Sequence, residues 1–199
     1  MTGASLIGVL ALQGGFRDHL DRLDAIGART RPVRSPADLA DLDGIVIPGG
    51  ESTTICRLLD AFELREPLTA ALATGLPAFG SCAGMIVLAD RVLDGRADQR
   101  PLAAIPLSVR RNAFGRQSDS FECELEVQGL GGGPFPAAFI RAPAIESIGH
   151  GVQVVAQVDG RPVAARTEHV LVTAFHPELT PDDRIHRLFL EMVAEHDRP

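Results

Sequence analysis

Cys82, in the segment GSCAG at residues 80–84, is the residue whose type and setting most directly indicate chemistry. The apolar run 76–79 before it predicts a buried strand, and the stretch 85–89 after it predicts a helix. A reactive residue flanked by glycines on a strand-to-helix turn is typical of a nucleophile elbow, where small neighbours permit a strained turn that exposes the side chain. A helix N-terminus favours a thiolate and offers N–H donors to an oxyanion. The segment therefore predicts a nucleophilic cysteine.

The other two cysteines favour a structural interpretation, because a free cysteine is more often a small buried hydrophobe than a catalytic group. Cys56 lies in the stretch 53–62, which predicts a helix, and Cys123 alternates with apolar residues in the predicted strand 121–127. An odd count of 3 cysteines without secretory context indicates reduced thiols and no disulfide framework. Of the three, only Cys82 has the setting of a nucleophile.

A histidine and a glutamate one residue apart, His176 and Glu178, follow the apolar run 170–175. In an extended backbone residues i and i+2 point the same way, and Pro177 biases the residue before it toward the extended region. We therefore expect the carboxylate to reach the imidazole. A histidine held in one tautomer by a carboxylate can take a proton from a thiol and later give it to a leaving amine. Taken alone, the pair favours a strand end with a solvated glutamate, but beside the elbow it predicts a base with its orienting carboxylate.

The composition limits the classes of protein to which the chain can belong. With 45% hydrophobic residues, the 199-residue chain can form one domain over residues 1–199 without disulfides or metal, and it has no clustered His/Cys spacing of a zinc site. A net charge of −7 and the absence of Trp and Tyr speak against nucleic acid or an anionic membrane surface as the main partner. The sequence shows no basic leader with a cleavage site and no apolar stretch of membrane-spanning length, so we expect a cytoplasmic protein.

The elements that must position these residues alternate between strand and helix through the first half of the chain. The expected strands are residues 6–12, 28–33, 44–47 and 76–79, and the expected helices are residues 16–26, 53–62, 66–74 and a short one that begins at 35–36. This alternation predicts a parallel sheet covered on both faces. In the second half, residues 121–127 and 151–175 predict strands that join the same sheet in antiparallel fashion, and residues 181–195 predict a closing helix.

The segment PGGEST at residues 48–53 is a further site candidate, because it leaves a predicted parallel strand and enters a helix, where open α/β sheets place their ligands. A simpler interpretation is a turn capped by Ser52 or Thr53, and both roles can coexist. The glycine run 129–133 predicts a flexible surface connection, since neither Lys nor a helix follows it.

Two arginine-containing segments and one histidine complete the candidates. An arginine in the polar loop 110–117, or Arg141 in the segment 139–143, can pair with a substrate carboxylate or bind a partner protein, although taken alone each segment fits a solvated loop. His19 stands three residues after Phe16 on the first expected helix, and we expect it at the surface or an interface.

With these segments assembled, the chain resembles, nearly end to end, the glutaminase subunits of pyridoxal 5′-phosphate synthase, a family of triad class I glutamine amidotransferases. The matching motifs are GVLALQG at 8–14, PGGEST at 48–53, GSCAGM at 80–85, RNAFGRQ at 111–117, FIRAP at 139–143 and FHPELT at 175–180. PGGES, the elbow and HPE indicate the class, whereas the arginine motifs indicate the family. The resemblance implies an α/β three-layer sandwich of the flavodoxin-like type, with a mainly parallel central sheet plus antiparallel additions.

The resemblance also implies roles for individual residues. Cys82 would attack the carboxamide of glutamine, with His176 as base and then acid and Glu178 holding the imidazole, and hydrolysis of the γ-glutamyl thioester would release glutamate. The positions that match glutamine contacts in the family are Gly49, Gly50, Glu51, Ser52, Arg111, Ile140 and Arg141. Backbone groups at Gly50 and Ala83 match the oxyanion hole.

The family resemblance implies a partner as well. A barrel-shaped synthase subunit, in a large hetero-oligomer, receives the ammonia through a tunnel and joins it to a pentose phosphate and a triose phosphate. Pyridoxal phosphate is then the product, and no cofactor or metal is expected here. Because the family's glutaminase is weak until the partner docks, we expect residues 48–52 to change arrangement on docking. Two departures from the family pattern, at residues 15–16 and 102–105, concern the interface.

Two other functions remain open from the sequence. One is a stand-alone cysteine hydrolase or an amidotransferase that serves another synthase, against which the family-specific arginine motifs argue. The other is a regulatory binding module that retained the fold, against which the intact set of Cys82, His176 and Glu178 argues.

Overall fold

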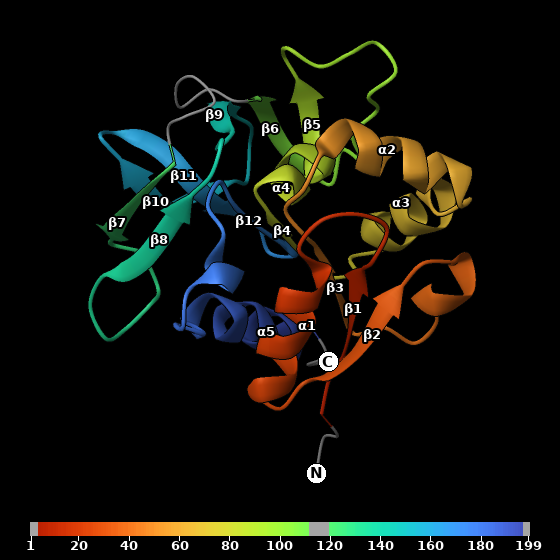
Figure 1. Ribbon diagram of the computed structural model, residues 1–199, viewed down its shortest axis with the longest axis horizontal. Coiled ribbons are helices and arrows are strands. Elements are labelled where there is room, and N and C mark those ends of the chain that lie inside the picture. The colour runs from red at the N-terminus through yellow and green to blue at the C-terminus, as the bar shows by residue number, and fades with distance from the viewer. Residues whose placement is uncertain (1–3, 112–119, 197–199) are drawn as a thin grey trace.

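The computed structural model describes residues 4–111 and 120–196, and within them the chain is built around one large sheet (Figure 1). The strands of this sheet are β1 (Leu6–Leu10), β2 (Arg29–Val33), β3 (Gly44–Ile47), β4 (Ala78–Ser81), β10 (Gln153–Val158), β11 (Arg161–Arg166) and β12 (Val170–Thr173). They are ordered β10-β11-β12-β4-β3-β1-β2. The five strands from β12 to β2 are parallel, whereas β10 and β11 pair antiparallel.

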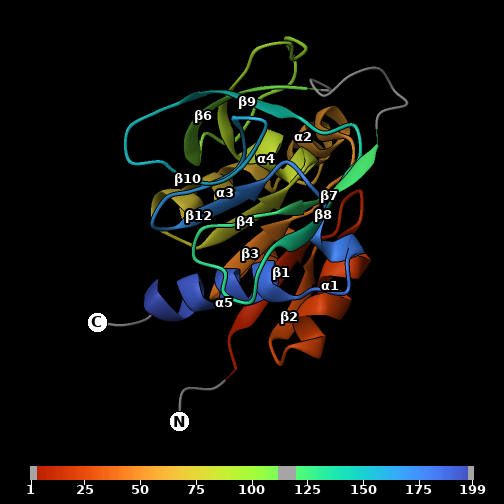
Figure 2. The same ribbon diagram turned by 90° about the vertical axis from the view of Figure 1, so that its left-hand side faces the viewer.

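Helices cover both faces of this sheet (Figure 2). One face carries α1 (Phe16–Ala25) and α5 (Arg184–His196), and the other carries α2 (Ser52–Ala61), α3 (Arg65–Ala73) and α4 (Ala83–Leu88). The inner strands are apolar on both sides, as in β3, where all four residues are buried. The predicted α/β three-layer sandwich, with a mainly parallel sheet and antiparallel additions, is confirmed.

The second half of the chain departs from the expected arrangement in two ways. Strand β7 (Phe121–Leu125) pairs with β8 (Phe135–Phe139) in a separate antiparallel hairpin instead of joining the large sheet. The Phe121 and Phe139 rings stack at 4.6 Å, a cross-strand contact that stabilises this pairing. Strand β12 was expected to be antiparallel but runs parallel to β4, which agrees with its continuous apolar run Val170–Thr173, buried on both faces.

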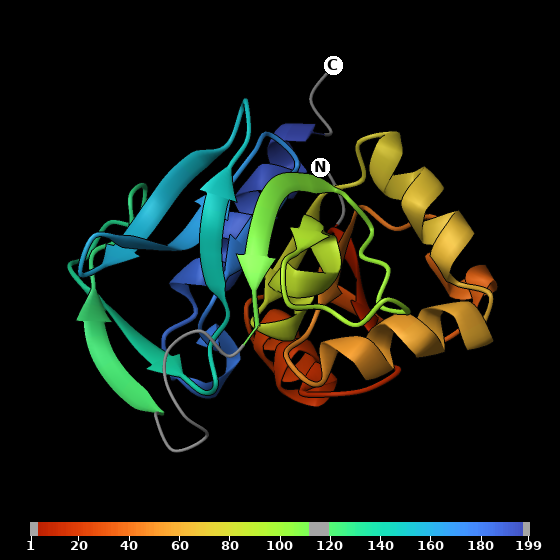
Figure 3. The same cartoon turned by 90° about the horizontal axis from the view of Figure 1, so that it is seen from above.

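A third, three-stranded sheet consists of β5 (Ala89–Val92), β6 (Ile105–Arg110) and β9 (Ala144–Ile148). It lies over α4 (Figure 3), and backbone hydrogen bonds tie the chain between β5 and β6 to this helix, for example Leu102 N–H to the Val87 carbonyl at 2.7 Å. Two short 3₁₀ turns, η1 (Pro36–Leu39) and η2 (Pro177–Leu179), complete the elements. None of the helices within residues 4–111 and 120–196 is long and apolar enough to cross a membrane.

Two glycines bring α4 unusually close to the sheet. A Cβ atom on Gly84 would lie 1.9 Å from the carbonyl oxygen of Ile47 on β3, and one on Gly80 would lie 2.7 Å from the Gly84 carbonyl group. Any larger residue at Gly84 would push the helix away from β3. The glycines that flank Cys82 in the sequence therefore fix the position of the helix that begins beside it.

Candidate active site

Cys82 occupies the turn between β4 and α4, as the elbow pattern predicts. Its backbone has φ 48° and ψ −104°, a conformation that L-residues rarely adopt and that usually marks a functional site. The Cys82 N–H donates to the Thr173 carbonyl of β12 at 2.8 Å, which ties the turn to the neighbouring strand. The Sγ atom lies 3.9 Å from the Ile140 carbonyl oxygen. The thiol is thus held at the carboxyl ends of two parallel strands, where open α/β sheets place ligands.

His176 and Glu178 lie beside this turn at the end of β12. The His176 Nδ1 atom is 2.7 Å from Glu178 Oε1, and the Glu178 side chain is almost fully buried. This contact was expected, but the prediction that it forms across an extended backbone is wrong. Pro177–Leu179 is a 3₁₀ turn, and this turn places the Glu178 carboxylate beside the imidazole. The backbone N–H of His176 donates to the Ala138 carbonyl at 2.9 Å, which ties the His176 main chain to β8.

The protonation states follow from these contacts. Burial lowers the pKa of His176, but hydrogen bonds to Cys82 and to Glu178 outweigh this effect and raise its pKa to about 10. Burial likewise raises the pKa of Glu178, but the contacts with His19 and His176 hold the pKa of this carboxyl below its usual value. At neutral pH the imidazole therefore carries a proton on each ring nitrogen, between the ionised Glu178 carboxylate and the Cys82 sulfur.

Three hydrogen bonds hold the segment from Gly49 to Glu51 against the site. The N–H of Gly49 donates to Ser81 Oγ at 3.1 Å, the Gly49 carbonyl accepts from Gly15 N–H at 3.0 Å, and Glu51 N–H donates to Gln13 Oε1 at 2.7 Å. Because the peptide is planar and trans, the N–H of Gly50 points away from Gly15. A Cβ atom on Gly49 would lie 2.4 Å from His176 Cε1, so only glycine lets this backbone pass the imidazole.

Glu51 caps helix α2, whereas Ser52 or Thr53 was expected to do so. The Glu51 carboxylate accepts from the N–H groups of Thr53 at 3.1 Å and Thr54 at 2.7 Å. Ser52 and Thr53 are buried instead, where their hydroxyl groups bond Gln99 at 2.9 and 3.3 Å. Burial raises the pKa of Glu51, but the hydrogen bonds from the threonines outweigh it, so the pKa lies below its usual value.

Arg111 reaches the same place from the end of β6. Its guanidinium donates to Glu51 Oε1 at 3.1 Å, to Thr53 Oγ1 at 3.0 Å and to Gln99 Oε1 at 3.2 Å. Of the expected loop 110–117, residues 112–117 lie outside the described residues. Arg141 has φ 46° and stands exposed next to Ile140. The two arginines thus add positive charge to the site beside the His176 imidazolium.

A cavity of about 260 Å³ joins these groups. It is lined by Gln13, Gly50, Glu51, Ser52, Cys82, Ala83, Ile86, Arg111, Ile140, Arg141 and His176. All site residues expected from the sequence line this cavity except Gly49 and Glu178. These two residues lie behind the lining and contact His176. The cavity is smaller than the roughly 300–1,000 Å³ of sites for drug-sized ligands, which suits a molecule of amino-acid size.

Sequence reasoning missed Gln13 and Ile86 as lining residues, and it placed His19 wrongly. Gln13 follows β1 at the carboxyl edge of the sheet, which is a signal that could have found it. His19 was expected at the surface or an interface but is fully buried, because its spacing from Phe16 and Leu23 places it on the same inward stripe of α1.

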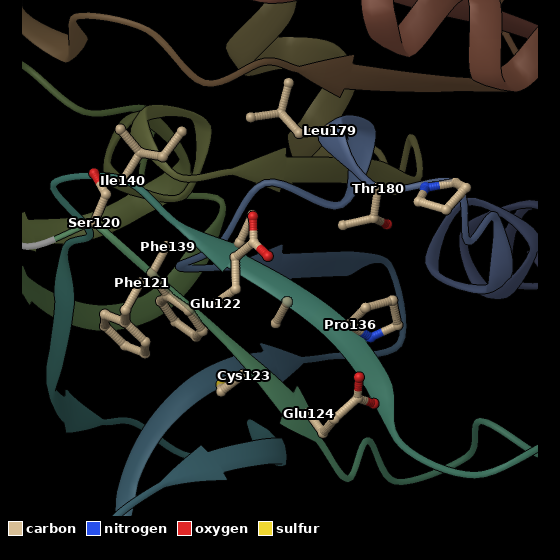
Figure 4. Close-up of a pocket in the computed structure, with 13 residues that line it drawn as sticks. Ser120, Phe121, Glu122, Cys123, Glu124, Pro136, Phe139, Ile140, Leu179 and Thr180 are labelled. Atoms are coloured by element: carbon tan, nitrogen blue, oxygen red, sulfur yellow. The ribbon is translucent and has the colours of Figure 1, made fainter.

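A larger hollow of about 950 Å³ lies along the hairpin of β7 and β8 and beside η2 (Figure 4). Cys123, Glu122 and Glu124 line it, and Leu179 stands at its far side. Cys123 has no histidine beside it in this lining, and burial raises the pKa of its thiol, which agrees with the structural interpretation of this cysteine. No group of three or more His, Cys, Asp or Glu among the described residues could hold a metal ion.

The fold and the placement of the cysteine define a class of protein. A crystal structure of a glutamine amidotransferase is 44% identical in sequence, covers 94% of this chain and 98% of that chain, and superposes with a TM-score of 0.89. A Thermoplasma acidophilum protein described as part of a GMP synthase shares the fold at 18% identity, with a TM-score of 0.70 over 98% of this chain and 97% of its own. The chain therefore has the fold of class I glutamine amidotransferases.

The sequence comparisons narrow this class to one family. The model of the SNO glutamine amidotransferase family matches residues 9–195. A Salinispora arenicola protein named pyridoxal 5′-phosphate synthase subunit PdxT is 57% identical over 195 residues, which cover 96% of this chain and 97% of the relative. A protein of the same name from Frankia alni is 58% identical over 187 residues, or 94% of each chain. The chain belongs to the SNO glutamine amidotransferase family.

Proposed function

We propose that the chain is the glutaminase subunit of a pyridoxal 5′-phosphate synthase, and that Cys82, His176 and Glu178 form its catalytic triad. The observation that carries this proposal is the set of contacts around one cavity: a strained Cys82 on the elbow, His176 beside it, and the 2.7 Å contact between His176 and Glu178. Further support comes from the family membership and from the names of relatives with 52–58% identity.

Acylation is the first half of the proposed reaction. The Cys82 thiolate attacks the carboxamide carbon of glutamine, and the backbone N–H groups of Gly50 and Ala83 stabilise the oxyanion. The His176 imidazolium, with its pKa raised to about 10, donates a proton to the leaving nitrogen. The C–N bond breaks, ammonia leaves and a γ-glutamyl thioester remains on Cys82. Glu178 holds Nδ1 so that Nε2 faces the reacting atoms.

Deacylation returns the site to its starting state. The neutral His176 now accepts a proton from water as the water oxygen attacks the thioester carbon. The C–S bond breaks, glutamate leaves and Cys82 is again a thiolate beside an imidazolium. Water and glutamine enter, ammonia and glutamate leave, and no cofactor takes part.

The charged groups of the cavity suit the α-amino and α-carboxylate groups of glutamine. Arg111 and Arg141 supply the positive charge for the carboxylate, and Glu51 supplies the negative charge for the ammonium. Gly50, Ser52 and Ile140 line the walls between these groups and Cys82, and Gly49 packs behind them against His176. Glutamine would compete with Arg111 for Glu51, which lies 3.1 Å from the guanidinium before substrate enters.

The ammonia is channelled to a barrel-shaped synthase subunit of the PdxS type in a large hetero-oligomer. Support for a synthase partner comes from the relatives, which are named as subunits of pyridoxal 5′-phosphate synthase. Docking would reorient the peptide between Gly49 and Gly50, which breaks the 3.0 Å hydrogen bond from Gly15 to the Gly49 carbonyl. Crystal structures with and without the partner that have the same peptide orientation would contradict this docking switch.

Covalent trapping tests the assignment of the nucleophile. Incubation with 6-diazo-5-oxo-L-norleucine, a glutamine analogue that alkylates nucleophiles in glutamine sites, should add one label, located on Cys82 by peptide mass mapping. Cys56 and Cys123 serve as internal controls and should stay unmodified, as should the Cys82→Ala variant. A label on either control cysteine, or none on the wild-type chain with its partner present, would overturn the proposed function.

A further inference from the structure

A second hydrogen-bonded group lies behind the proposed triad, on the face of the sheet covered by α1 and α5. His19 of α1 is fully buried, and its Nε2 atom lies 3.0 Å from Ser81 Oγ and 3.4 Å from Glu178 Oε2. Its Nδ1 atom lies 3.0 Å from Nε2 of His186 on α5, which is also fully buried. Phe79 packs edge-on against both histidine rings, with ring centroids at 5.8 and 5.9 Å.

This group connects two parts of the site. Ser81 Oγ accepts the hydrogen bond from Gly49 N–H at 3.1 Å, so it holds the segment proposed to form the oxyanion hole. Glu178 Oε1 contacts His176, whereas Oε2 is buried and has no hydrogen-bond partner among the described residues. A buried carboxylate oxygen without a donor is costly. The nearest ring nitrogen of His19 is the group placed to relieve this cost.

The position of the His19 proton follows from its surroundings. Burial lowers the pKa of His19 and lowers that of His186 to about 3, so both rings are neutral and each carries one N–H. A lone pair on His19 Nε2 would face a buried carboxylate oxygen at 3.4 Å, which is repulsive, whereas an N–H there is attracted to it. The proton therefore belongs on Nε2 of His19, and Nδ1 is an acceptor.

The contacts of His186 favour the same tautomer of His19, with its proton on Nε2. If His19 Nδ1 is an acceptor, the proton of His186 lies on Nε2 and points at it. This arrangement leaves His186 Nδ1, which has no partner among the described residues, as a lone pair. The opposite tautomer would leave a buried N–H donor without an acceptor, and such orphaned donors are rarer than orphaned acceptors in proteins. Both histidines therefore favour the Nε2-protonated form.

We propose that His19 is a positioning residue for the glutaminase reaction: its Nε2–H, held in place by His186, is shared between Glu178 Oε2 and the Ser81 oxygen that binds Gly49. One N–H thereby fixes the triad carboxylate and the oxyanion segment relative to each other. His19 lies outside the residues that line the cavity, so it acts through these two groups and not on glutamine. The inference rests on the proposed function of Cys82, His176 and Glu178.

Two substitutions of similar size separate the roles of the two ring nitrogens. His19→Gln keeps an N–H donor near the place of Nε2, whereas His19→Asn keeps a polar group only near the place of Nδ1. We expect His19→Asn to lower kcat by roughly 10- to 150-fold, the rate equivalent of one hydrogen bond to a charged group, with KM for glutamine nearly unchanged. His19→Gln should recover most of kcat. His150→Asn, at an exposed histidine in the turn after β9, is the matched control and should behave as wild type.

A double variant tests whether His186 acts through His19. His186→Leu alone should lower kcat by several-fold because the His19 tautomer is then no longer held, and it should add nothing in the His19→Asn background. Equal kcat for His19→Gln and His19→Asn, or a loss confined to KM, would overturn the proposal, as would fully additive effects of the two substitutions.

The tautomers can be measured without any activity. Long-range ¹⁵N–¹H correlation spectra of the wild-type chain at pH 7.5 should show His19 and His186 protonated on Nε2 only, and a His19 protonated on Nδ1 would overturn the proposal even if the variants fold poorly. The kinetic assays are made with the synthase partner present. Absence of glutamate release from the wild type would contradict the proposed function, whereas an active wild type with Nδ1-protonated His19 contradicts this inference alone.

Discussion

Replacing Glu178 by glutamine removes a charge from the site while keeping the shape of the side chain. Glu178 is 4% exposed, and its Oε1 accepts from His176 Nδ1 at 2.7 Å. A glutamine there can turn its NH₂ group toward Nδ1, which moves the imidazole proton to the nitrogen that faces Cys82 and leaves no charge to stabilise the imidazolium. The change therefore acts on the protonation of His176 and leaves the cavity lining in place.

The expected magnitude follows from this single contact. A buried hydrogen bond to a charged group is worth about 1.5–3 kcal/mol, and each 1.36 kcal/mol of barrier is a factor of ten in rate. Glu178→Gln should therefore lower kcat by roughly 10- to 150-fold. Because Glu178 lies outside the residues that line the cavity, KM for glutamine should stay within about twofold of wild type.

The assay is glutamate release over a range of glutamine concentrations, measured by a coupled dehydrogenase with the synthase partner present. Glu195→Gln, which removes the same charge from an exposed position on α5, is the control and should match the wild type. A Glu178→Gln variant that folds and keeps kcat within about twofold of wild type would refute the role given to this carboxylate.

Three further predictions concern packing and titration. Gly84→Ala should lower the free energy of unfolding by about 2–4 kcal/mol in chemical denaturation, because its Cβ would lie 1.9 Å from Ile47 O; a change below about 0.5 kcal/mol would contradict the packing argument. The pKa of Glu178 in the folded chain lies below its ordinary 4.5, so the ionised carboxylate stabilises the fold above pH 4.5, and this contribution is lost as the pH falls through the pKa of the folded state. Glu178→Gln should therefore make Tm fall less steeply as the pH is lowered below 4.5. An equally steep fall of Tm in the variant and the wild type would contradict this prediction. Because the pKa of His176 is raised to about 10, the imidazolium is lost only near that pH, so kcat/KM should fall there and not near pH 6.5.

Local sequence signals predicted the parallel half of the fold well. Short local patterns predict the strands that end beside Cys82 and His176 and the turn that holds Cys82. Right-handed crossover connections between parallel strands then bring the carboxyl ends of these strands to one edge of the sheet. The predicted partner of β7 and the predicted antiparallel direction of β12 were wrong, because strand pairing is decided by contacts between residues far apart in the chain, such as the Phe121 and Phe139 stack and the pairing of β12 with β4.

Other parts of the site could not be predicted from local pattern. The capping of α2 by Glu51 depends on Ser52 and Thr53 being buried against Gln99, a residue on a later loop. The hydrogen bonds of His19 join α1 to β4 and α5, its 3.4 Å contact with Glu178 adds η2, and only the folded chain brings these residues together. A histidine on an apolar helix face was a usable signal of burial, but its partners were not readable from the sequence.

Glutamate release from glutamine, measured for the chain with and without a barrel-type pyridoxal 5′-phosphate synthase subunit, is the decisive measurement for the proposed function. We predict release that rises when the partner is added and disappears in the Cys82→Ala variant under both conditions. Release that persists in Cys82→Ala, or no release from the wild type even with the partner present, would contradict the assignment of this chain as a docking-activated glutaminase.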